Sequence, residues 1–138
     1  LYMVQKLREK GEINEGELMD DYVTFLAGIF RSIRFGATSA HGRANMIRFN
    51  FFEQKGAFSR DEATGTYRVN KDEFEAAVRE LGATILTLQG QGDYAAVAAF
   101  VAVMGNVGEA LQADLDRLAD AAIPVDIVFE QGVEVLGL

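Results

Sequence analysis

The sequence predicts a mainly α-helical fold: a multi-helix domain with one small β-hairpin and an extended C-terminal tail. Apolar residues recur at three- and four-residue steps in several long segments, and glycines separate these segments. Strand-like alternation occurs only near residues 58–69 and in the tail. The 138 residues are 49% hydrophobic, which suffices for the core of one compact domain. We therefore expect residues 1–138 to form a single helical unit.

Glycines delimit the first two predicted helices. Residues 1–10 suit a short helix that ends at Gly11, because glycine adopts a left-handed conformation at little steric cost. The second helix covers residues 17–35 and ends at Gly36. Its apolar surface is too broad for one face, which predicts packing on several sides. That surface comprises Leu18, Met19, Tyr22, Val23, Phe25, Leu26, Ile29, Phe30 and Ile33.

The third predicted helix covers residues 40–55. Thr38 or Ser39 can cap its start, and Gly56 ends it. A helix turns by 100° per residue, so polar side chains occupy two opposite sides of this one. One side carries His41, Asn45 and Arg48 together with Phe52, and the other carries Arg43, Asn50 and Gln54.

The remainder of the chain predicts a hairpin, three helices and a final strand. Phe58 and residues 67–69 flank a turn of four or five residues. Asn70 and Glu73 resemble a capping box, and Gly90 and Gly92 break the helix that follows. Further helices cover residues 94–104, capped by Asp93, and residues 109–121, before a short strand over residues 124–130. The residue 71–90 helix has an apolar stripe of Phe74, Ala77, Val78, Leu81, Ile85 and Leu88.

Composition excludes several functional classes. With 13 basic and 21 acidic residues, the net charge of −8 disfavours binding to nucleic acid or to an anionic membrane. The absence of cysteine excludes disulfides and sulfur-ligated zinc, and it fits a cytoplasmic protein. The most apolar run, residues 94–104, is 11 residues long, whereas a membrane-spanning helix needs about 20. We expect it to be a buried helix of a soluble domain.

His41, the only histidine, is the main candidate for proton chemistry. Imidazole is the side chain that ordinarily titrates near neutral pH, and no cysteine offers a thiolate. The alternative is a structural imidazole that is hydrogen-bonded locally near a helix start. Four arginines could bind a carboxylate bidentately, although capping of carbonyl groups or pairing with acids is the favoured interpretation. These arginines are Arg31, Arg34, Arg43 and Arg48.

No complete metal site is predicted. The two-histidine helix motif of zinc hydrolases needs a second imidazole that this chain lacks. The carboxylates of Glu15, Glu17, Asp20 and Asp21 lack the spacing of a calcium loop, and a solvated helix N-terminus explains them better. Phosphate-loop and Gly-x-Ser-x-Gly motifs are also absent.

Several segments, in order and spacing, resemble the C-terminal part of dipeptidyl peptidase III-type zinc peptidases. They are residues 25–36, 40–45 and 53–58, the hairpin, residues 70–74 and residues 89–94 with the Gly105 break. Members of that family hold zinc on a His-Glu-x-x-Gly-His or His-Glu-x-x-x-Gly-His helix and on a later Glu-Glu-x-Arg-Ala-Asp-like helix. Neither motif occurs here. Leu1 and Tyr2 resemble residues that follow the second motif, so the resemblance implies zinc ligands outside this chain.

The resemblance also implies roles for side chains of the third helix. A histidine matching His41 lines the active site of these peptidases and stabilises the transition state by donating to the developing oxyanion. Many members carry an arginine four residues later, where this chain has Asn45. A neutral amide replaces a bidentate cation there, and Arg48, one turn further, can substitute in part. Arg43 is a third candidate, either for substrate binding or for orienting the helix or a neighbouring acid.

We therefore expect the substrate-cleft portion of a zinc-dependent dipeptidyl peptidase that is inactive by itself. Its partners would be the upstream part of the same polypeptide and a short peptide substrate, and the isolated piece would expose apolar surface and self-associate. The alternative is a noncatalytic helical scaffold or interaction domain. Some bacterial relatives are fused to Nudix hydrolases or named as such, so the scaffold could belong to such a protein. The Nudix pattern itself, Gly-x5-Glu-x7-Arg-Glu-x2-Glu-Glu, does not occur here.

Overall fold

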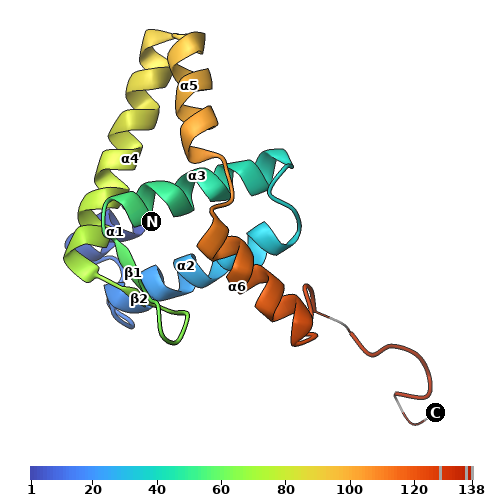
Figure 1. Ribbon diagram of the computed structural model, residues 1–138. Coiled ribbons are helices and arrows are strands. Elements are labelled where there is room, and N and C mark those ends of the chain that lie inside the picture. The colour runs from blue at the N-terminus through green and yellow to red at the C-terminus, as the bar shows by residue number, and fades with distance from the viewer. Residues whose placement is uncertain (128, 136, 138) are drawn as a thin grey trace. The chain divides into compact units, whose positions relative to one another are not determined.

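Helices separated by short connections make up most of the computed structural model, which describes residues 1–127, 129–135 and 137 (Figure 1). Within this part of the chain there are six helices and one antiparallel hairpin, as the sequence predicts. The helices are α1 (Tyr2–Glu9), α2 (Leu18–Arg34), α3 (Ala40–Gln54), α4 (Lys71–Gln91), α5 (Tyr94–Met104) and α6 (Glu109–Asp120). The strands are β1 (Phe58–Asp61) and β2 (Thr66–Val69).

The chain divides into two compact units, Leu1–Val107 and Gly108–Leu138. The second unit contains α6, and the described residues that follow α6 form turns and bends. The strand expected over residues 124–130 is therefore wrong for the described part of that segment, and Val128 lies outside the described residues. A strand needs a hydrogen-bonding partner, and β1 and β2 pair only with each other.

Aromatic side chains form the core of the first unit. Tyr22 of α2 stacks on Phe74 of α4, with ring centroids 4.7 Å apart. Phe49 of α3 contacts Phe30 of α2 at 5.4 Å and Phe58 of β1 at 4.9 Å. Tyr22, Phe49 and Phe74 are fully buried, so α2, α3, α4 and the hairpin share one hydrophobic centre. The broad apolar surface expected for residues 17–35 is confirmed, because α2 contacts α3, α4 and β2.

Most helix ends follow the sequence signals. Ser39 caps α3 and Asp93 caps α5, each accepting a 3.0 Å hydrogen bond from a backbone N–H of the first turn. Two expectations for α4 are wrong. The Asn70 side chain makes no cap bond and instead donates to the carbonyl of Gly56 at 2.8 Å. Gly90 lies inside α4, which ends at Gly92 with a left-handed φ of 64°.

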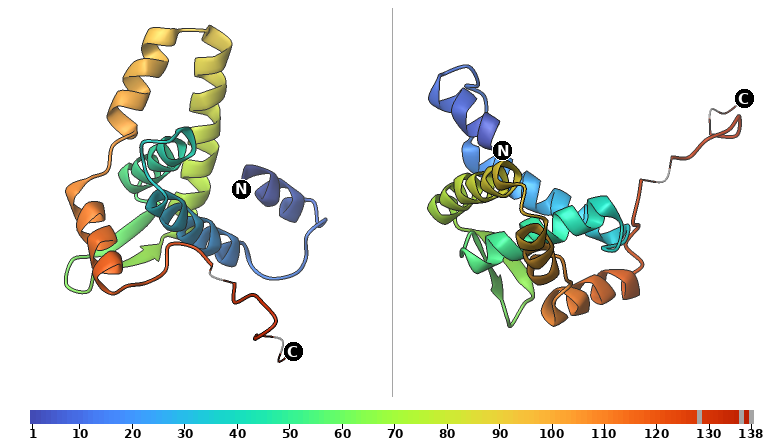
Figure 2. Two further views of the ribbon diagram at one scale, coloured as in Figure 1. Left: turned by 90° about the vertical axis from the view of Figure 1, so that its right-hand side faces the viewer. Right: turned by 90° about the horizontal axis from the view of Figure 1, so that it is seen from above.

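The helices α4 and α5 form a helical hairpin, and both contact α3 (Figures 1 and 2). The prediction that residues 94–104 are buried is wrong, because no residue of α5 is buried in the structure. Val103 is 71% exposed, and Leu86 on α4 is 70% exposed. This hairpin therefore presents apolar side chains at the surface of the first unit. No single helix in the described residues is long and apolar enough to span a membrane; α5 and α6 meet that test only as a bent pair.

Candidate functional site

His41 lies in the first turn of α3, where a cap and a close backbone approach fix the helix start. The Ser39 hydroxyl accepts from the backbone N–H of Gly42 at 3.0 Å and donates to the carbonyl of Gly36 at 3.2 Å. A Cβ atom at position 42 would lie 2.0 Å from that same Gly36 oxygen. Only glycine fits there, so the connection between α2 and α3 packs directly against the turn that carries His41.

Polar side chains on one side of α3 form a short hydrogen-bonded ladder. Asn45 donates its amide to the backbone carbonyl of His41 at 3.1 Å, and its carbonyl oxygen accepts from Arg48 at 2.8 Å. The imidazole of His41 is exposed, and no described residue hydrogen-bonds to it. The local hydrogen bond of the structural alternative is thus missing. The shared face predicted for His41, Asn45 and Arg48 is consistent with this ladder.

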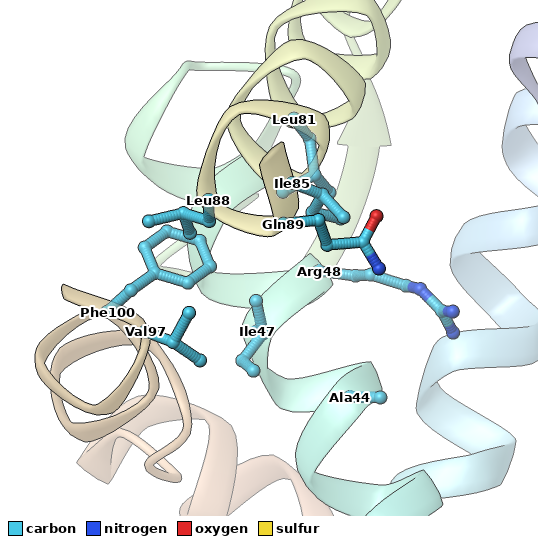
Figure 3. Close-up of a pocket in the computed structure, with 9 residues that line it drawn as sticks. All are labelled: Ala44, Ile47, Arg48, Leu81, Ile85, Leu88, Gln89, Val97 and Phe100. Carbon is cyan, nitrogen blue, oxygen red and sulfur yellow. The ribbon is translucent and has the colours of Figure 1, made fainter. Parts of the chain in front are cut away.

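An apolar groove of about 270 Å³ adjoins Arg48 between α3, α4 and α5 (Figure 3). The aliphatic stem of Arg48 lies at its edge, and the guanidinium points away from the apolar side chains. The first four members of the α4 stripe are buried, and the last two, Ile85 and Leu88, are more exposed and line the groove. The sequence does not show this groove, because it depends on where α5 lies. The other lining residues are Ala44, Ile47, Leu81, Gln89, Val97 and Phe100.

Arg43 lies on another side of α3, beside the end of α5. It lines an open cavity of about 390 Å³ together with Gly105 and Asn106. Asn50, predicted on the same side as Arg43, donates to the carbonyls of Met104 and Asn106 at 2.8 and 2.7 Å. The predicted division of α3 into two polar sides is therefore confirmed. It separates Arg43 from the groove that Arg48 borders.

Among the described residues, no group of three or more histidine, cysteine or acidic side chains is placed to hold a metal ion. The acidic residues near the start of α2 have structural partners. Asp20 accepts from the backbone N–H of Glu17 at 3.1 Å, and Asp21 accepts from Arg8 at 2.8 Å. The interpretation of this acidic segment as a helix N-terminus is confirmed.

Burial and hydrogen bonds shift the pKa values of several described side chains. Burial raises the pKa of Tyr22 and that of Glu53, in the last turn of α3. A hydrogen bond from Lys6 lowers the pKa of Glu9, and backbone hydrogen bonds lower that of Asp61 in the hairpin.

Comparison with known proteins finds no family model that matches the chain. Two solved structures share its fold. DPP III from Caldithrix abyssi has a TM-score of 0.85 and 39% identity over 91% of this chain. Dipeptidyl-peptidase III from Corallococcus sp. strain EGB has a TM-score of 0.84 and 36% identity over 92% of it. The chain is homologous to part of dipeptidyl peptidase III.

The chain spans only 24% and 23% of the lengths of those two structures' chains. A curated relative, Nudix hydrolase 3 of Arabidopsis thaliana, is 39% identical over 127 residues, which is 92% of this chain and 16% of the relative. The chain is therefore similar both to part of dipeptidyl peptidase III and to part of a protein named as a Nudix hydrolase. The resemblance to dipeptidyl peptidase III, carried by residues 25–36, 40–45 and 53–58, the hairpin, residues 70–74 and residues 89–94 with Gly105, is confirmed.

Two residues that position the candidate site are not evident from the sequence. Gly42 allows the close approach of residue 36, and Asn50 attaches the end of α5 to α3. The only sequence signal for Gly42 is a glycine inside the first turn of a helix, where alanine has the higher helix propensity. Asn50 lies in the middle of a helix, where the neighbouring sequence does not indicate which distant carbonyl groups its side chain would bond.

Proposed function

We propose that this chain is the C-terminal, substrate-cleft portion of a dipeptidyl peptidase III-like zinc peptidase that cleaves short peptides. The supporting observation is the polar face of α3, where His41, Asn45 and Arg48 follow one another in a segment homologous to that enzyme. Because the chain spans about a quarter of those relatives, activity belongs in this proposal to the whole polypeptide.

In the proposed reaction, His41 donates an imidazole N–H to the oxygen that gains negative charge as the peptide bond is attacked. An exposed ring without a local hydrogen bond is free to make that contact. Arg48 keeps further N–H groups beyond the one given to Asn45, and these can hold a substrate carbonyl or carboxylate. Arg43, on the other side of α3, would contact substrate only through a different part of the cleft.

Zinc is part of the proposal only for the whole enzyme. The family resemblance implies zinc, but the donor groups in the described part of this chain do not form a site for it. The ligands would therefore come from the upstream part of the same polypeptide, which is the first proposed partner. A cytoplasmic location, and the lack of a nucleic-acid or membrane partner, remain predictions from composition.

The proposal is tested by His41→Ala in the full-length protein. Loss of an oxyanion donor typically lowers kcat by about 10²–10³-fold, and we expect a loss of that order with short peptide substrates. Bound zinc and the melting temperature should be unchanged, because the imidazole is exposed. Gln54→Ala, at the exposed far end of α3, is the matched control and should retain full turnover. Normal turnover in His41→Ala would refute the catalytic role.

A noncatalytic interaction domain is the second candidate, because the hairpin of α4 and α5 presents exposed apolar side chains. Its partner would be the remainder of the polypeptide or a second copy of this chain. The His41→Ala measurement separates the two candidates. In a scaffold, the substitution leaves activity unchanged, whereas changes on the α4–α5 surface alter association.

A further inference from the structure

The cavity beside Arg43 is distinct from the groove that Arg48 borders. Arg43, Thr38 and Asn106 supply its polar groups, and Ala37, Val101 and Val107 supply apolar ones. It is therefore much more polar than the neighbouring groove, whose lining is almost entirely hydrocarbon. Small-ligand sites usually combine an apolar lining with a few polar groups that orient the ligand, and this cavity has both.

The guanidinium of Arg43 has no partner among the described residues. An arginine beside a helix C-terminus commonly donates to the last carbonyl groups, and three of the last four carbonyls of α5 already accept a hydrogen bond from another donor. The carbonyl of Val101 accepts from the Gly105 N–H at 2.8 Å, and that of Ala102 accepts from Asn106 at 2.5 Å. Asn50 bonds to the carbonyl of Met104 at 2.8 Å. Arg43 is thus left with all of its N–H groups available.

The stem of Arg43 nevertheless lies close to Gly105, while the side chain as a whole is exposed. Its side chain runs over Gly105, where an added Cβ would lie 3.2 Å from the Arg43 Cγ and 2.6 Å from the Val101 oxygen. The two hydrogen bonds from Asn50 hold this turn against α3. Arginines elsewhere in the chain, such as Arg8 and Arg79, lie against carboxylates. No described carboxylate lies against Arg43.

We propose that the Arg43 cavity is a binding site for a carboxylate group. A planar carboxylate matches the fork of the guanidinium and accepts two parallel hydrogen bonds from it. The Thr38 hydroxyl and the Asn106 amide lie on the same cavity and supply neutral polar contacts. A single cation in a chain of net charge −8 favours a singly charged group over a phosphate dianion. The carboxylate belongs either to a free small ligand or to an aspartate or glutamate of the longer polypeptide.

The test follows the Nε–Hε signals of arginine in this chain by NMR, at constant ionic strength, during titration with N-acetylglycine. We expect the Arg43 signal, identified by its loss in Arg43→Gln, to move saturably. N-acetylglycinamide, the neutral probe of the same shape, should leave it in place. Arg68, exposed on β2, is the internal control and should not respond. Equal responses at Arg43 and Arg68, or an Arg43 shift that does not saturate, would overturn the proposal.

Two variants keep the test independent of simple charge loss. Arg43→Lys keeps the cation but loses the bidentate fork, so it should weaken N-acetylglycine binding. Gly105→Ala leaves Arg43 in the chain but displaces its stem, and it should weaken binding as well. Binding that is unchanged in both variants would place the ligand elsewhere.

The same titration on the longer polypeptide distinguishes the two sources. A free-ligand site still responds to N-acetylglycine there. If an acidic side chain of the same polypeptide occupies the cavity, the Arg43 signal already has its bound position, and Arg43→Gln lowers the melting temperature more than Arg68→Gln does. An Arg43 signal that neither responds nor occupies the bound position would contradict both sources.

Discussion

At the scale of single residues, Gly42 determines how the candidate site is held. Its Cβ position is blocked by backbone atoms of Gly36 and Ala37, which cannot move as a flexible side chain would. We predict that Gly42→Ala destabilises the protein by at least about 1–3 kcal/mol, the usual cost of overpacking. Gly28→Ala in α2 is the matched control, because nothing lies within 4 Å of its added Cβ. That change should stabilise the protein by about 0.5–1 kcal/mol.

Urea unfolding of the two variants measures the difference. The argument is contradicted if Gly42→Ala unfolds at the same urea concentration as the unmodified chain. NMR signals of His41 and Ser39 should shift in this variant, because Ser39 bonds to the residues on both sides of the close approach.

The family resemblance implies an arginine at the position where this chain has Asn45. We predict that Asn45→Arg in the full-length protein lowers KM for short peptides, because a bidentate cation replaces a neutral amide. The gain should be larger for peptides with a free C-terminal carboxylate than for their amides. The change also removes the acceptor that holds Arg48, so Asn45→Gln, which keeps an amide, is the control. An unchanged KM for both peptide types would count against a substrate role for this face.

The helical period explains which parts of the candidate site could be predicted from the sequence. It placed His41, Asn45 and Arg48 on one face and Arg43 and Asn50 on another, and the structure shows the same division. The contacts of Gly42 and Asn50 were not predictable, because their partners lie in other elements. Asn50 bonds to residues 54 and 56 positions away, beyond the reach of any local pattern.

At the scale of elements, local capping rules succeed where no tertiary partner competes. Ser39 and Asp93 cap their helices as expected. Asn70 does not, because its amide reaches the carbonyl of Gly56, the residue that ends α3. That bond connects the end of α3 to the start of α4 across the hairpin. Gly90 stays helical because glycine only weakens a helix interior, whereas Gly92 adopts the left-handed conformation that ends it.

The hairpin turn makes a pH-dependent contribution to the stability of the folded chain. Asp61 accepts hydrogen bonds from the backbone N–H groups of Thr64 and Ala63, both at 2.9 Å, and these lower its pKa. The pKa of Asp61 is lower in the folded chain than in the unfolded chain. The stabilisation is therefore fully present at pH values above the unfolded pKa, which is about 4. It is lost as the pH falls through the folded value.

We predict that Asp61→Ala weakens the hairpin at neutral pH and that the difference from the unmodified chain shrinks below about pH 4. Asp61→Asn keeps an acceptor but does not titrate, so its hairpin should respond less to acid. NMR titration of the Asp61 carboxyl carbon and of the hairpin amides measures both effects. A carboxyl that titrates at or above the ordinary aspartate value would contradict the assignment.

At the scale of the whole molecule, the exposure of α5 is the largest departure from the sequence-based expectation. Its run of apolar residues predicted burial, since such a composition normally marks a core helix. Within the described first unit, α3 covers only part of α5, and no α5 residue is buried. The hydrophobicity of a helix indicates that burial of its surface is favourable, but it does not identify the segment that packs against that surface. Contiguous apolar surface on a monomer commonly marks an interaction site.

We predict that this chain, studied by itself, self-associates through the exposed side chains of α4 and α5. Val103→Glu and Leu86→Glu place a charge at positions 71% and 70% exposed, so they should shift the chain toward monomer without unfolding it. Thr24→Glu adds the same charge at an exposed position on α2 and should leave association unchanged. Sedimentation velocity over a range of concentrations measures the distribution of species, and circular dichroism checks the fold. A chain that stays monomeric at high concentration, or association that persists in both variants, would show that this surface does not bind a second copy.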